Sequence, residues 1–368
     1  MPRPPFLLVA LAVMATACGA SVEAGPGSAP TTSAPPTTVA VTSTTTTPPL
    51  TTTTVATTTT SSTVPPKGRL VIHGVGDVNV DPDYIPALAA EGYDHAWSGL
   101  DGLFLTDDLT VVNLECPAAL GGAPLDKAFT FRCDPEALDE MAAAGVDVAG
   151  QANNHVLDYG ADAMLESLGH LADHGIGAPG AGASAAEAYA PHLVDVHGWT
   201  IAVLGFGGPR GPGPWIATDD RPGMADGRDP AAMVAAVEAA AAVADLVVVT
   251  IHWGVELDTQ PRPHQVARAR AMVAAGADVI FGHHSHRLQP MSVLDGAAVF
   301  WGLGNFVWPR LSVPGATTAV AEVVIAPDGT LEQACLIPAT IVSHGHPELD
   351  GPYTGCYGIE SAIIDVDA

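Results

Sequence analysis

Three histidines crowd into four positions in the stretch FGHHSHRLQP, which runs from Phe281 to Pro290 and directly follows an apolar run. Imidazole rings at the end of a buried strand need binding partners, and histidine is the commonest protein ligand of metal ions. His284 and His286 are therefore predicted metal ligands. The alternative is that they are core histidines satisfied by neighbouring protein groups.

Polar side chains close four other strand-like runs in the same way. They are Asp77, Glu115, Asn154 with His155, and His252. Ligands of open α/β sheets bind at the carboxyl ends of the strands, so these groups are expected to meet. Carboxylate, amide and imidazole ligands without thiolates indicate one or two divalent ions, namely Mn, Fe or Zn. Asp77 and Asn154 have a simpler alternative, which is to shape the turns that follow their strands.

The same motifs suggest residues for catalysis and substrate binding. His155 is the candidate proton donor, and Asp158, three residues on, is placed to hold its tautomer. The alternative for Asp158 is to cap the helix that follows. The candidates for substrate binding near these motifs are Trp253, Glu256, Arg262 and Arg287. For the two arginines, the alternative is a salt bridge with neighbouring acids.

Strand-like and helical runs alternate along the chain from about Lys67. Helices are predicted over about 134–144, 161–174, 229–244 and 263–275, with apolar strands between them. The later segments are strand-like without intervening helices. This order predicts one α/β domain over residues 67–368, with mostly parallel strands and a late antiparallel meander.

The N-terminal segment has the features of an export signal. Residues 1–18 combine an early Arg3 with a short apolar run and end in ATAC, which resembles a lipobox. We therefore expect a lipid anchor on Cys18 at the outer face of the membrane, with ordinary cleavage and secretion as the alternative. Residues 19–66 are rich in Thr, Pro and Ser and are expected to form a disordered linker.

Charge and cysteine content narrow the possible partners. With 13 basic and 40 acidic residues, the formal net charge of −27 argues against nucleic acid and against membrane contact beyond the anchor. Two sequence-local disulfides are predicted for an oxidising compartment, Cys116 with Cys133 and Cys335 with Cys356. Four cysteines allow three pairings, so this assignment is one of three.

Six stretches, taken in order, resemble the bacterial capsule-synthesis CapA family. This family is also called the poly-γ-glutamate synthesis PgsA family and belongs to the calcineurin-like metallophosphatase superfamily. The matching stretches are GDVN at Gly76, NLE at Asn113, ANNHVLDYG at Ala152, HWGVE at His252, GADVIFGHHSH at Gly276 and LGNF at Leu303. The resemblance implies an α/β fold, a metallophosphatase-like sandwich of two mixed β-sheets flanked by helices.

The resemblance also implies roles for single residues. Asp77 is similar to the first-motif aspartate, Glu115 to the bridging acid, and Asn154-His155 to an Asn-His pair of metal ligand and acid. The later histidine ligands correspond to His252, His284 and His286. Two positions depart from the phosphatase pattern: Asn79 stands where the first motif has His, and Glu115 where an Asp is usual.

The implied function is extracytoplasmic capsule or poly-γ-glutamate synthesis. The expected partners are this polymer or a related anionic polymer, together with membrane-bound proteins of capsule synthesis. Hydrolysis would use metal-activated water at a phosphoryl or carbonyl centre, with His155 assisting the leaving group. Enzymatic activity itself is left open. The alternatives are a non-enzymatic polymer-binding or export subunit and a secreted metallophosphoesterase.

Overall fold

The computed structural model describes residues 66–211, 213–352 and 366. The predicted signal segment, nearly all of the predicted linker, and Cys356 lie outside these residues. Within the described part, no helix has the length and apolarity needed to cross a bilayer.

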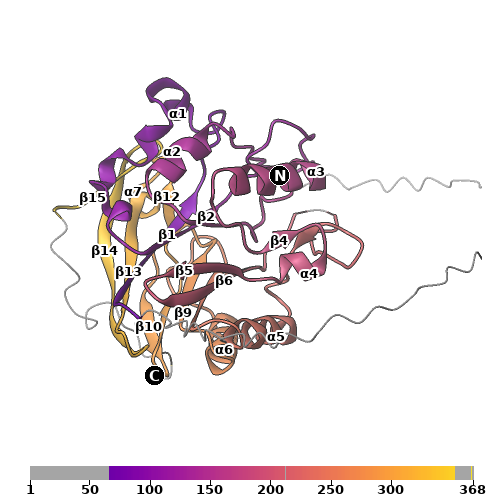
Figure 1. The fold of residues 1–368 in the computed structure, drawn as a ribbon. Helices are drawn as coiled ribbons and strands as arrows, with labels where there is room; N and C mark the ends of the chain where they lie inside the picture. The colour runs from indigo at the N-terminus through magenta and orange to yellow at the C-terminus, as the bar shows by residue number, and fades with distance from the viewer. Residues whose placement is uncertain (1–65, 212, 353–365, 367–368) are drawn as a thin grey trace, which may run out of the picture. The chain divides into compact units, whose positions relative to one another are not determined.

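The first sheet combines a parallel block with an antiparallel meander (Figure 1). The parallel block consists of β1 (Leu70–Val78), β2 (Leu109–Leu114), β3 (Val148–Gly150) and β12 (Asn305–Val307). The meander consists of β13 (Thr317–Ile325), β14 (Leu331–Ser343) and β15 (His346–Leu349). β13 pairs antiparallel with β1 and so joins the two parts.

The second sheet has a parallel centre and antiparallel edges. Its order is β10 (Met291–Leu294), β11 (Ala297–Phe300), β9 (Val279–His283), β8 (Leu246–His252), β6 (Trp199–Gly207) and β5 (His192–Val196). β10 and β5 are the antiparallel edge strands. A small separate ladder pairs β4 (Ala181–Gly182) with β7 (Gly223–Met224).

Helices and turns cover the outer faces of both sheets. The first sheet packs against α1 (Pro86–Glu91), α2 (Ala137–Ala143) and the 3-10 turns η1 (Tyr93–Ala96), η2 (Ser98–Leu100) and η3 (Leu103–Leu105). The second packs against α5 (Pro230–Ala241) and α6 (Pro263–Ala274). The remaining helices are α3 (Gly160–Asp173), α4 (Ala185–Ala188) and α7 (Val313–Ala316). The predicted α/β sandwich of two mixed sheets flanked by helices is confirmed.

The sheets pack on each other because their strands are apolar on both faces. In β2, Leu109 and Val111 face the second sheet, whereas Val112 and Leu114 face the helices of the first. Gly74 of β1 lies so close to the second sheet that a Cβ there would be 2.5 Å from the Phe281 ring. This close packing fixes the strand ends of one sheet relative to those of the other.

A buried ionic contact links the parallel block to the meander. The Nδ1 atom of His73 in β1 lies 2.8 Å from Asp107 Oδ2, and its Nε2 atom lies 3.2 Å from Glu322 Oε2 in β13. Burial alone would lower the pKa of His73, but the two carboxylates raise it. The charged His73 therefore contributes its full stabilisation of the fold below the pKa of His73 in the unfolded chain, about 6.5. This contribution is lost as the pH rises through the pKa of His73 in the folded protein.

We expect His73→Gln to lower the free energy of unfolding by about 3 kcal/mol at pH 6, because two buried carboxylates lose a cation. The deficit relative to the wild type should shrink at pH 8.5. Denaturant unfolding at the two pH values measures both effects. His174→Gln serves as the control, because His174 contacts an exposed Asp139 and should cost less than about 1 kcal/mol. An equal deficit at both pH values would contradict a charged His73.

Candidate metal centre

The polar strand ends of the two sheets form two rows in register. In the first sheet, Asp77 is paired with Asn113 of β2 and with Asn305 of β12. In the second sheet, His252 of β8 is paired with His283 of β9. The first sheet thus supplies acids and amides, and the second supplies imidazoles, at one edge of the sandwich.

Two groups of metal-ligating side chains meet at this edge. One is formed by Glu115, His252 and His284, and the other by Asp77, Glu115 and His286. In each group, one ligand atom per residue lies within 4.8 Å of the others. Glu115 belongs to both groups, so its carboxylate is placed to bridge two ions.

The chemistry of Glu115 fits a bound cation. Its side chain is fully buried, and no hydrogen bond from the described residues reaches either carboxylate oxygen. His252 Nε2 is 3.3 Å from Oε1, outside hydrogen-bond geometry. Burial and the neighbouring charge of Asp77 raise the pKa of Glu115 well above its usual range. A buried carboxylate in this situation is costly unless a cation compensates it.

The two histidines of the first group, His252 and His284, are in the neutral form that metal binding requires. Burial and the neighbouring ring of His284 lower the pKa of His252 well below its usual range. Burial and the neighbouring ring of His286 lower the pKa of His284 to about 4. Both rings are therefore neutral near pH 7, and neutral imidazole is the form that binds metals.

His286 is held differently, by an acid. Its Nδ1 atom lies 3.1 Å from Asp77 Oδ2 and 2.8 Å from Asn305 Oδ1. Burial alone would lower the pKa of His286, but Asp77 and Glu115 raise it to about 9. The same contact holds the pKa of Asp77 below its usual range, although burial alone would raise it. If this group held a metal ion, His286 would have to lose its proton to act as a ligand, since neutral imidazole is the form that binds metals.

Amide side chains connect the acids to the histidines. Asn113 Nδ2 donates to Asp77 Oδ1 at 2.8 Å and lies 3.3 Å from His252 Nδ1. Asn153 Nδ2 donates to Leu114 O at 2.8 Å and to Asn113 Oδ1 at 3.2 Å. Sequence reasoning missed the positioning roles of Asn113 and Asn153. The position of Asn113, in register with Asp77 on the next parallel strand, is the signal that could have revealed it.

The predicted ligand Asn154 also reaches the cluster, since its Oδ1 atom lies 2.6 Å from His252 Nε2. Asn79, which stands where the phosphatase pattern has His, is buried and has a structural role. Its Oδ1 atom accepts a hydrogen bond from the backbone of Asp81 at 2.9 Å, which shapes the turn after β1. His283 remains outside both ligand groups, with its Nδ1 atom 3.7 Å from Asp77 Oδ1.

His155 is oriented toward the cluster by Asp158. Its Nδ1 atom lies 2.7 Å from Asp158 Oδ2, and its Nε2 atom lies 3.9 Å from Glu115 Oε1. Lys127 Nζ donates to the other Asp158 oxygen at 2.6 Å, and the backbone N–H of Phe131 donates to Oδ2 at 2.8 Å. Asp158 is not the residue that caps α3, since the N-cap position is Tyr159. Burial lowers the pKa of His155.

The predicted substrate-binding residues have separate locations. Glu256 and Arg287 line a cavity of about 220 Å³ that includes His155 and His286. Trp253 is 1% exposed, and its indole N–H donates to Trp301 O at 3.0 Å, so its ring packs mainly in the core while the residue also lines the cavity on the His284 side that is described below. The other walls of the cavity are mainly aromatic and apolar: Tyr84, Phe129, Phe131, Leu257, Trp308 and Leu311.

Arg262 pairs with a nearby acid. Both its Nε and Nη2 atoms donate to the carboxylate of Asp258, four residues earlier, and the side chain lines neither this cavity nor the second cavity described below. The structure gives Arg262 the salt bridge that was its alternative. Asp258 lies in the loop before α6 and Arg262 is the N-cap of that helix, so the pair joins the loop to the start of the helix.

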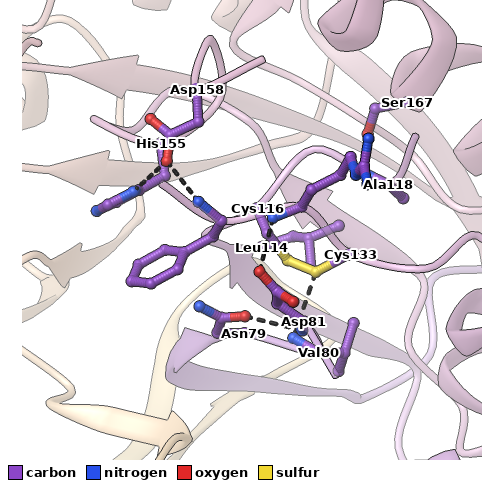
Figure 2. The surroundings of a disulfide bond; sticks show 12 residues. Asn79, Val80, Asp81, Leu114, Cys116, Ala118, Cys133, His155, Asp158 and Ser167 are labelled. Carbon is purple, nitrogen blue, oxygen red and sulfur yellow. Dashed lines mark hydrogen bonds and ion pairs between the residues drawn. A yellow bond between two sulfur atoms is a disulfide. The ribbon is translucent and has the colours of Figure 1, made fainter. Parts of the chain in front are cut away.

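A disulfide holds the segment that reaches His155. Cys116 and Cys133 are joined, with Cα atoms 5.6 Å apart, and Figure 2 shows the bond beside Asn79, His155 and Asp158. The enclosed segment carries Lys127, and its Phe131 ring stacks on His155 with centroids 4.3 Å apart. The pairing of Cys335 in β14 with Cys356 stays a prediction, because Cys356 lies outside the described residues.

The turn after β9 has an unusual backbone. His284 has a φ of 87° and His286 a φ of 50°, in the left-handed region that side chains other than glycine seldom adopt. Such residues cost about 1–3 kcal/mol each and persist where the surrounding structure holds them. Here the turn directs one imidazole into each ligand group.

We expect the double variant Cys116→Ala/Cys133→Ala to unfold with a free energy about 3 kcal/mol lower, as for a closed loop of this length. The loss should be accompanied by faster proteolysis within residues 117–132, because the tether of this segment is gone. Denaturant unfolding and limited proteolysis measure the two effects. Ser184→Ala, which removes a hydrogen bond at the short helix α4, is the control and should leave that segment protected. Unchanged proteolysis in the double variant would contradict the tethering role.

Comparisons with known proteins agree on one family. The family model described as bacterial capsule synthesis protein PGA_cap matches residues 71–310. The PGA biosynthesis protein CapA of Bacillus subtilis (strain 168) is 32% identical over 259 residues, 70% of this chain and 68% of that protein. The capsule biosynthesis protein CapA of Bacillus anthracis is 30% identical over 270 residues, 71% of this chain and 65% of that protein. The matched part thus spans about two thirds of each relative.

Among solved structures, the NAD nucleotidase NadN of Haemophilus influenzae is similar at a TM-score of 0.48 and 13% identity. The match covers 77% of this chain and 52% of that one. A likeness at this level supports no conclusion about activity.

Proposed function

This chain belongs to the bacterial capsule synthesis protein PGA_cap family, and from that premise we propose that it is an exported, metal-binding accessory protein of poly-γ-glutamate capsule synthesis. The names of the Bacillus relatives support the pathway. The polymer, or a related anionic polymer, is the proposed substrate. Its proposed partners are membrane-bound proteins of the same synthesis.

One observation carries the metal site: the buried Glu115 carboxylate, shared by two ligand groups and free of hydrogen bonds from the described residues. The proposed ligands of one or two Mn, Fe or Zn ions are Asp77, Glu115, Asn154, His252, His284 and His286. Oxygen and nitrogen ligands without thiolate suit these metals.

The proposed reaction is hydrolysis at a phosphoryl or carbonyl centre. When bound, divalent ions supply Lewis acidity and lower the pKa of water. His155 presents Nε2 toward Glu115, while Asp158 holds Nδ1, so a ring that carries a proton on both nitrogens is oriented to donate the Nε2 proton to the leaving group. Lys127 and the backbone of Phe131 fix the Asp158 carboxylate. The buried amides Asn113 and Asn153 keep Asp77 and its neighbours in place.

Export is proposed from the N-terminal sequence, with lipidation of Cys18 or secretion as the two routes. The disulfide between Cys116 and Cys133 supports an oxidising compartment, because such bonds are rare in the cytosol. The strongly acidic composition supports a partner other than nucleic acid.

We expect the purified protein to hold one or two equivalents of Mn, Fe or Zn, and the double variant His284→Ala/His286→Ala to hold less than about a tenth of this, since loss of a residue that only hydrogen-bonds to a metal ligand already costs about 10–100-fold in affinity. Elemental analysis after gel filtration measures the content. His170→Ala is the control, because His170 lies on α3 and pairs with an exposed Glu166. No metal in the wild type after incubation with excess ion would refute the site.

We expect the metal-loaded protein to hydrolyse a generic phosphodiester or a γ-linked glutamate oligomer, and His155→Gln to lower kcat by about 10²–10⁴-fold, because a general acid is removed. Metal content should stay at the wild-type level in this variant. Release of nitrophenol or of glutamate measures turnover. Full metal loading with no turnover of either compound would favour a polymer-binding subunit over a hydrolase.

A further inference from the structure

A second cavity opens beside the candidate metal centre, on the side of His284. Its volume is about 530 Å³, and its walls include Arg228, Arg268, His264 and Glu256. The aromatic cavity reaches the centre through His155 and His286 instead. Glu256 lines both cavities, so they are neighbours around one centre.

The second cavity is lined by basic side chains, which are scarce in this chain. Only 13 of the 368 residues are Lys or Arg, against 40 acids, yet two arginines line this cavity. His264 and Arg268 stand four residues apart on α6 and so share one face of that helix. Arg228 directly precedes Asp229, the N-cap of α5, and its side chain is 53% exposed.

Few acidic side chains lie near these two arginines, so their positive charges are only partly compensated. Asp226 is bound by Arg210, and Arg228 Nε lies 4.0 Å from the same carboxylate oxygen. The half-buried Arg268 side chain makes no hydrogen bond or ion pair with the residues that the structure describes. Burial lowers the pKa of Arg268, the charge of Asp226 raises it and the charge of Arg228 lowers it, so this guanidinium lies near one acid and one cation. Glu256 is exposed and adds one negative charge at the boundary of the two cavities.

Two neighbouring guanidinium groups without enough acid around them form a site for oxyanions, since each can bind a carboxylate or phosphate through two parallel hydrogen bonds. The cavity is larger than a single ion needs, because its volume equals that of more than ten water molecules at about 30 Å³ each. A chain that bears several carboxylates uses both arginines at once and fills this space.

We propose that Arg228 and Arg268 form a subsite that binds the carboxylates of a γ-linked glutamate chain on the His284 side of the metal centre. This inference rests on the proposed function, because it names the substrate class of the same site. It assigns substrate recognition to two residues from the segments before α5 and within α6, in place of Arg262.

Titration calorimetry of the full chain with a γ-linked pentaglutamate, at saturating Mn²⁺, tests the subsite. We expect Arg228→Gln and Arg268→Gln each to weaken binding about tenfold, as for loss of one charged hydrogen-bonding partner. Arg69→Gln is the matched control, because it removes the same charge from an exposed pair with Glu332 at the opposite end of β1. It should bind like the wild type.

Inorganic phosphate and a γ-linked pentamer whose α-carboxylates are amidated (an isoglutamine chain) separate the possible ligands. Weak phosphate binding and no binding of the amidated chain support a site for several carboxylates. Phosphate binding as tight as that of the pentaglutamate would overturn the polymer assignment. Arginine variants that bind like Arg69→Gln would overturn the subsite itself.

The metal content of every variant is measured in parallel. Arginine variants with wild-type Mn²⁺ content and unchanged pentaglutamate affinity would refute the subsite and leave the proposed metal site intact. A wild type that binds the pentaglutamate through these arginines but holds no metal would refute the proposed metal site and retain the subsite.

Discussion

A buried carboxylate to which no residue in the described part of the chain donates a hydrogen bond is the constraint on which the candidate centre depends. Glu115 carries that carboxylate, with Asp77 as a second buried acid close by. Two like charges inside a protein are tolerated only when cations or protons compensate them. The first sheet contributes the acids and the second contributes the imidazoles, so neither sheet alone could support the cluster. The stacking of the two sheets thus assembles the site and is held in place by it.

The strand ends were predictable because periodicity and position are local properties of the chain. Asp77, Glu115, Asn154, His252 and the histidine turn each follow an apolar run, and parallel strands bring such ends to one edge. The structure does bring them together. The pair of Arg262 with Asp258 was left open as an alternative, because Asp258 lies in a loop before α6, where sequence spacing does not determine which side chains meet.

The cavity walls, by contrast, could not be read from the sequence. Trp308 follows β12, Tyr84 precedes α1, and Arg228 precedes α5. No periodic pattern marks these residues, because their position depends on where each loop lies after long-range packing. The edge strand β5 was not predicted for a different reason: its positions alternate between half-buried and exposed, but the apolar Leu193 stands at an exposed position and hides the alternation in the sequence. What remained unpredictable was therefore the geometry around the site, and not which strand ends meet there.

The left-handed backbone at His284 and His286 lowers the stability of the fold, but it orients the two imidazoles of the candidate metal centre. Glycine would adopt these dihedral angles without strain, but glycine has no imidazole. Directed evolution for thermal stability alone would therefore favour glycine at His284 and His286. Variants obtained in this way would keep the two-sheet fold but lose the two histidines of the candidate metal centre. The strained turn therefore indicates selection for a function in addition to stability.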